Sequence, residues 1–185
     1  MLQDYYYWMF LISFCMTMLY AAKWHKHFDI HITLVFVLVP ITNLGFVFQG
    51  AATDVDSYII GTKIGYIGGC YLEFCLLMSI LNLCHFRVRK LWKACGFLLC
   101  SLMYLVVLTI GYLPVFYRNA GMRTSQGKTV FVKEYGPLHS VFWAMISLLF
   151  AVSIGVIIYS WFRRTQVSRV ILILVFIPEF IALFA

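Results

Sequence analysis

The sequence predicts an all-α protein: a polytopic transmembrane helix bundle with six helices present, the sixth clipped, out of an expected seven. Composition is the first reason, because 63% of the 185 residues are hydrophobic and 11% are charged, whereas soluble domains carry about 25% charged residues. The second reason is that several apolar runs approach or exceed the roughly 20 residues that a helix needs to cross a bilayer. The third is the distribution of basic residues among the loops, which places the N-terminus outside the cell.

The first two helices are expected over residues 5–22 and 30–49. The first opens on an aromatic run from Tyr5 to Trp8, which is typical of a membrane interface. A secretory signal peptide would instead begin with a basic segment and end at a cleavage site, so we interpret this helix as retained. Pro40 lies inside the second helix and is expected to kink it.

The third helix is expected over residues 58–84 and carries the most distinctive pattern. Gly61, Gly65 and Gly69 recur every four residues, and Gly68 adjoins them. This many glycines would disfavour a helix in water, but in a bilayer small residues let helices approach closely. We therefore expect the four glycines to be packing positions, with this helix at the centre of the bundle.

The remaining helices are expected over residues 91–113, 137–162 and 170–185. Residues 115–136 form the longest polar segment, and its turn residues followed by a β-prone run predict a small hairpin lying over the bundle. The last apolar run stops after 16 residues, fewer than a membrane crossing usually takes. We therefore expect the chain to be a fragment that lacks a seventh helix.

Basic residues are distributed unequally between the two sides of the predicted bundle. The turns after the first, third and fifth helices hold nine Lys and Arg residues, and the opposite side holds five. Cytoplasmic loops carry the excess of positive charge in membrane proteins, so the N-terminus is expected outside. Because the cations fit this role, the net charge of +7 does not indicate a nucleic-acid partner. The lipid bilayer is the expected partner.

Two carboxylates lie inside predicted helices, and each costs roughly 2.5–3.5 kcal/mol to insert. At about 1.5 Å per residue, Glu73 lies roughly 16 Å and Glu179 roughly 14 Å from the inner ends of their helices. They can therefore meet at one depth, where two close carboxylates share a proton, and we interpret them as a mid-membrane switch. The alternative is a protonated Glu73 that serves only as a structural hydrogen-bonding group.

Three residues are candidates for binding a ligand from outside. Lys63 lies near the outer end of its helix and either extends to the interface or faces the bundle with Asn43, Asp54, Asp56 or His139 and binds an external ligand. In the second case the three would form an outward-facing pocket. A lone histidine such as His139 is more often a structural hydrogen-bonding group than a ligand, so both interpretations stay open.

No pattern in the chain indicates an enzyme or a metal site. All six cysteines lie within or at the ends of apolar runs, and no CxxC pair occurs. His25 and His27 stand among lysines on a short turn, where contact with lipid headgroups is the expected use. Phosphate-binding, metalloprotease and nucleophile motifs are absent from the sequence. We expect no catalytic residue, no metal and no cofactor in this chain.

Several stretches along the chain carry a resemblance to a known family. They are KWHKHFD (23–29) leading into TLVFVLVPITNLG (33–45), KIGYIGG (63–69), LTIGY (108–112), KEYGPLH (133–139) and IPE (177–179). On these stretches the whole chain resembles the seven-helix N-terminal sensory region of bacterial histidine kinases. It looks closest to versions in clostridial-type signalling proteins, where the region precedes a GGDEF diguanylate cyclase domain, often with an EAL domain.

The resemblance implies a membrane-embedded signal-input module in the bacterial inner membrane. Such a module senses an extracellular or membrane stimulus and controls a cytoplasmic diguanylate cyclase or histidine kinase, which is absent from this chain. It also implies a homodimer formed through that output domain. The alternative is a small proton- or ion-coupled transporter or channel that uses Glu73 and Glu179. Transporters often contain inverted repeats, and none is evident between the halves of this sequence.

Overall fold

The computed structural model describes residues 2–24, 28–125 and 128–163 and contains five long helices and one hairpin. The helices are α1 (Leu2–Lys23), α2 (Ile30–Ala51), α3 (Val55–Leu83), α4 (Lys90–Leu108) and α5 (Pro137–Phe162), and the strands are β1 (Tyr117–Ser125) and β2 (Lys128–Tyr135). All five helices are long and apolar enough to cross a membrane. The predicted transmembrane bundle is thereby confirmed. The sixth helix, expected over residues 170–185, lies outside the described residues.

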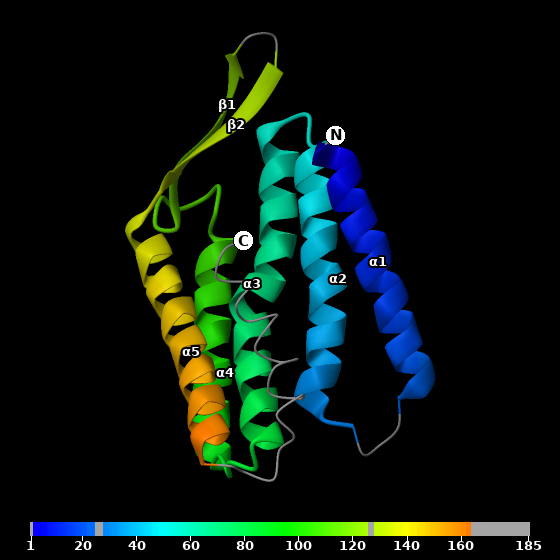
Figure 1. Cartoon of the computed structure of the whole chain (residues 1–185). Helices are drawn as coiled ribbons and strands as arrows, with labels where there is room; N and C mark the ends of the chain where they lie inside the picture. Colours follow the sequence, from blue (N-terminus) through cyan, green and yellow to red (C-terminus); the bar gives the residue numbers. More distant parts are fainter. Residues whose placement is uncertain (1, 25–27, 126–127, 164–185) are drawn as a thin grey trace.

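Helix α3 is the centre of the bundle, because it packs against α2, α4 and α5 (Figure 1). Helix α1 packs on the far side of α2. The hairpin projects from the end of the bundle where the N-terminus and the α2–α3 turn lie (Figure 1). This is the end that the loop charges assign to the outside, and we call it the outer end.

Two of the helix boundaries that differ from the expected ones have clear local reasons. Helix α3 begins three residues early, because the Asp54 carboxylate accepts a hydrogen bond from the Ser57 backbone N–H at 2.8 Å and caps the helix. The same bond lowers the pKa of Asp54. Helix α4 ends at Leu108 instead of residue 113. A tight turn follows, in which the Ile110 N–H donates to the Val107 carbonyl at 3.0 Å, and Gly111 then takes φ +89°, a conformation suited to glycine.

The freed carbonyl at the proline of α2 has a partner on α1. Pro40 has no N–H, so the carbonyl four residues earlier, on Phe36, loses its helical donor. The Thr17 hydroxyl donates to this carbonyl at 2.5 Å. Tyr20 and Thr33 add a hydroxyl pair at 2.8 Å. Such interhelical hydrogen bonds hold helices together in a bilayer, and here they attach α1 to α2.

The glycines of α3 divide between two neighbouring helices. A Cβ added to Gly61 would lie 2.7 Å from the Gln49 backbone nitrogen, and one added to Gly68 would meet the Thr42 side chain, so both face α2. Gly69 faces away from α2, because its nearest neighbours are Tyr66 at 3.3 Å and Phe142 at 3.7 Å. The reason is that 3.6 residues make one turn, so a four-residue spacing drifts around the helix.

The α2 side of this interface also depends on a glycine, Gly45, which the sequence analysis did not single out. A Cβ on Gly45 would meet the backbone of Gly65 and lie 2.8 Å from the carbonyl oxygen of Gly61. The two backbones are therefore in direct contact. This close approach is typical of small-residue packing between transmembrane helices.

Candidate ligand pocket at the outer end

The base of the hairpin is anchored in a cluster of aromatic side chains, which we call the outer aromatic cluster. Its members are Tyr66 of α3, Phe116 and Tyr117 at the start of β1, Tyr135 of β2, and His139 and Phe142 of α5. Phe116 is completely buried and Tyr117 is 4% exposed. The ring centroids of Phe116 and Tyr66 lie 5.1 Å apart in an edge-to-face arrangement, which is a favourable geometry for aromatic pairs.

Backbone hydrogen bonds fix the two strands to the start of α5. The Gly136 N–H donates to the Phe116 carbonyl at 2.8 Å, and the Leu138 N–H donates to the Val115 carbonyl at 3.1 Å. Gly136 also needs its lack of a side chain, since a Cβ there would meet the backbone of Val115. The hairpin base is therefore held against the membrane-spanning part at defined points.

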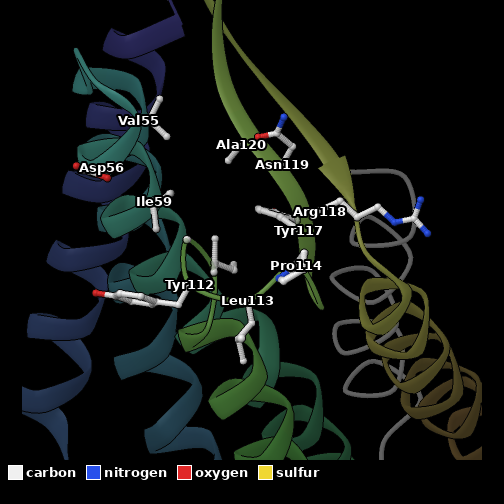
Figure 2. Close-up of a pocket in the computed structure, with 12 residues that line it drawn as sticks. Val55, Asp56, Ile59, Tyr112, Leu113, Pro114, Tyr117, Arg118, Asn119 and Ala120 are labelled. Carbon is white, nitrogen blue, oxygen red and sulfur yellow. The ribbon is translucent and has the colours of Figure 1, made fainter.

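A pocket of about 310 Å³, which we call the outer pocket, lies between this hairpin and α3 (Figure 2). Its lining comes from the first turns of α3, from the loop between α4 and β1, and from β1 itself: Val55, Asp56, Ile59, Ile110, Gly111, Tyr112, Leu113, Pro114, Tyr117, Arg118, Asn119 and Ala120. Residues 55–59 of α3 are far in the chain from residues 110–120, which run from the loop directly into β1. Only the fold brings them to one place.

The interior of the outer pocket is uncharged. Figure 2 shows Asp56 and Arg118 on opposite sides of it, with the Arg118 guanidinium directed away from the space between them. Apolar contact comes from Ile59, and hydrogen-bonding capacity comes from the Asn119 amide. Burial raises the pKa of Tyr117, so its hydroxyl stays protonated at physiological pH. The lining thus suits a small molecule with uncharged polar groups.

Tyr117 connects the outer pocket to the central helix. Its hydroxyl lies 3.2 Å from the hydroxyl of Tyr66, and the two groups share a hydrogen bond. Tyr66 lies on α3 two turns above Glu73. Any displacement of Tyr117 by a ligand therefore acts directly on the helix that packs against three others.

Two of the three predicted ligand-binding residues lie next to this pocket, although neither lines it. The Lys63 ammonium lies 5.0 Å from the centroid of the Tyr112 ring, and Tyr112 lines the pocket. The His139 ring stacks on Tyr135 with centroids 3.9 Å apart, and its centroid is 6.0 Å from that of Tyr117. Lys63 and His139 thus each contact a residue that lines the pocket, Tyr112 and Tyr117 respectively.

The third predicted residue, Asn43, lies elsewhere. Its amide donates to the Ser13 hydroxyl at 2.9 Å and to the Met9 carbonyl at 3.3 Å, so it joins α1 to α2. The expected grouping of Asn43 with Lys63 and His139 does not occur among the described residues. Residues 43 and 63 occupy adjacent antiparallel helices, but the Asn43 side chain contacts α1 and the Lys63 side chain contacts Tyr112. Spacing in the sequence does not reveal this difference.

Glu73 lies deep in the bundle, at the contact between α3 and α5. It is 9% exposed, and the Ser153 hydroxyl donates to its Oε1 at 3.5 Å. Ser153 is completely buried. The expected partner of Glu73, Glu179, lies outside the described residues. The α3–α5 contact therefore contains a buried polar pair at mid-helix depth.

Comparisons with known proteins point in one direction. The family model described as the N-terminal 7TM region of histidine kinase matches residues 7–185. No curated protein and no solved structure matches the chain. The matched region includes α1 from residue 7 onward, helices α2 to α5 and both strands of the hairpin.

Proposed function

This chain belongs to the family of N-terminal seven-transmembrane regions of histidine kinases, and from that premise we propose that it senses a small extracellular molecule in the outer pocket. The family itself implies a membrane sensory input module without catalytic activity of its own. In our proposal the binding event is relayed to a cytoplasmic output domain, either a histidine kinase or a diguanylate cyclase. The output domain would also form the homodimer, and the bacterial inner membrane is the proposed location.

One observation carries this proposal: the outer pocket is built from three segments that meet at Tyr117. A ligand held there would contact α3, the α4–β1 loop and β1 together, and would change their relative positions. Tyr117 passes the change to Tyr66 through their shared hydrogen bond. Because α3 packs against α2, α4 and α5, a shift of this helix reaches the cytoplasmic end of the bundle. Family membership favours this sensory role over a transporter.

Filling the outer pocket tests the proposal without knowledge of the ligand. Ala120 points into the pocket (Figure 2), and Ala120→Trp would occupy the space that a ligand needs. We expect this change in the full-length protein to weaken the apparent affinity for the stimulus at least about tenfold, which corresponds to 1.4 kcal/mol. The measurement is the activity of the output domain at increasing concentrations of components of the extracellular medium.

The matched control is Gly121→Trp on the same strand. Residue 121 is the neighbour of Ala120, so its side chain points to the opposite face of the strand, and nothing lies within 4 Å of a Cβ placed there. This control should respond like the wild type. A normal response of Ala120→Trp would contradict ligand binding in the outer pocket.

Glu73 is the proposed mid-membrane part of the same relay. Glu73→Gln keeps the side-chain shape and a hydrogen-bonding oxygen for Ser153 but removes the ability to ionise. We expect this variant to fold normally and to shift the stimulus response or its pH dependence in the full-length protein. Ser153→Ala, which removes the donor on α5, should shift the response in the same direction. If both variants respond like the wild type, Glu73 has a structural role only.

A further inference from the structure

A second hollow, which we call the lateral groove, lies behind the hairpin base. It has a volume of about 220 Å³ and is lined by five elements. The lining includes Phe46 of α2, Gly65 and Gly69 of α3, Phe142 and Trp143 of α5, Lys133 of β2 and Tyr117 of β1. Tyr117 lines both this groove and the outer pocket. A single aromatic side chain is therefore part of the wall of both spaces.

The end of the lateral groove near the hairpin carries a positive charge. Lys133 is the one charged residue of the lining. Its ammonium lies 5.8 Å from the ring centroids of both Tyr117 and Tyr135, where cation–π attraction holds it. Among the described residues it forms no ion pair. The charge of Lys133 is thus held at the groove and is available to an anionic group.

The other end of the lateral groove is apolar and open. Phe46 is 38% exposed and Trp143 is 55% exposed, so their rings border the opening between α2 and α5. Gly65 and Gly69 contribute no side chains to the lining, which also includes the polar side chains of Thr42, Gln49 and Thr62. Trp143 lies six residues into α5, about 9 Å along the helix. The groove therefore runs from a cation at the membrane surface to aromatic walls at the depth of the upper acyl chains.

We propose that the lateral groove binds one anionic glycerophospholipid of the outer leaflet, with its phosphate beside Lys133 and an acyl chain between Phe46 and Trp143. The charge at one end and the mostly apolar walls below it match such a lipid. This inference depends on the proposed orientation of the chain, and not on a ligand in the outer pocket. Because Tyr117 borders both spaces, lipid occupancy would adjust the sensitivity of the sensor.

Quenching of Trp143 fluorescence tests the lipid site directly. The whole chain would carry Trp8, Trp24, Trp92 and Trp161 replaced by Phe, in phosphatidylcholine vesicles that contain a minor fraction of phosphatidylglycerol. Bromine on the acyl chains of one lipid or the other reports which lipid contacts Trp143. We expect brominated phosphatidylglycerol to quench with about fivefold higher relative affinity than brominated phosphatidylcholine, the effect of one cation near an anionic headgroup.

The matched variants are Lys133→Gln and Arg118→Gln. Each removes one cation from the hairpin base, but Arg118 lines only the outer pocket. Lys133→Gln should reduce the preference for phosphatidylglycerol to about one, while Arg118→Gln retains it. Native mass spectrometry of the chain with all five tryptophans, counting bound phosphatidylglycerol, repeats the comparison without the Trp replacements.

Three results would overturn the proposal. They are an absence of lipid preference in the wild type, a preference that survives Lys133→Gln, and a Trp143 that neither brominated lipid quenches because another part of the chain fills the groove. None of these outcomes depends on the outer pocket. A failure of Ala120→Trp to alter sensing, with the lipid preference intact, would contradict the proposed function alone.

Discussion

Replacing Phe116 with alanine is expected to lower the free energy of unfolding by about 3–5 kcal/mol, the range for large aromatic residues removed from a core. Phe116 is completely buried. Its ring contacts four other rings, those of Tyr66, Tyr117, His139 and Phe142. Removing it leaves a cavity under the hairpin base. The measurement is unfolding in mixed micelles with increasing dodecyl sulfate, followed by tryptophan fluorescence.

The control for this experiment is Phe162→Ala at the other end of the bundle. Phe162 is 79% exposed, so its removal should change the free energy of unfolding by less than about 0.5 kcal/mol. We also expect Phe116→Ala to make the hairpin easier to cleave with protease, because both strands lose their anchor. A loss below 1 kcal/mol at Phe116 would show that the outer aromatic cluster does not hold the hairpin.

The helices were predictable from the sequence because a bilayer permits few alternatives. Backbone groups in hydrocarbon must pair within their own segment, so a long apolar run becomes a helix with little dependence on its neighbours. The hairpin was also predictable from local sequence, because its turn residues are followed by a β-prone run. The end of α4 was missed, since residues 109–113 contain no charge or proline that would end a helix and the turn depends on the backbone of Gly111.

The outer pocket was not predictable, because most residues of its lining are uncharged and its two parts, residues 55–59 and residues 110–120, are distant in the chain. Ile59, Tyr112 and Asn119 give no signal of their own in a sequence this rich in apolar and aromatic residues. Lys63 was a predicted site residue because it is a charge near a helix end, and in the structure its ammonium lies beside the Tyr112 ring. Asn43 shows that a polar residue in an apolar helix does not always belong to a binding site. Its polar side chain pairs with Ser13 for helix packing.

The four-residue spacing of Gly61, Gly65 and Gly69 led us to expect packing positions, but the spacing does not say which helix each glycine faces. The structure has Gly61 and Gly68 facing α2 and Gly69 facing Phe142. Helical drift explains the difference, but the essential partner on α2, Gly45, is identified only when both helices are seen together.

We expect Gly45→Ala to destabilise the bundle by about 3 kcal/mol, the upper end of the range for overpacked interiors. The added methyl group would meet the backbone of Gly65 and the carbonyl oxygen of Gly61, 2.8 Å away. Backbone atoms have no alternative rotamer, so α2 and α3 must separate along their contact. The same dodecyl sulfate titration measures the loss.

Gly65→Ala provides the decisive comparison, because it adds the same methyl group to the partner helix. Its Cβ would have the Gln49 side-chain nitrogen as nearest neighbour at 3.5 Å, an ordinary contact. We expect a change within about 0.5 kcal/mol, despite the position of Gly65 in the middle of the sequence repeat. The four-residue repeat in the sequence has Gly65 at its centre and therefore predicts that Gly65→Ala is the more damaging change. The packing of α2 against α3 predicts instead that Gly45→Ala is the more damaging change. Equal losses from the two substitutions would contradict the direct backbone contact at Gly45.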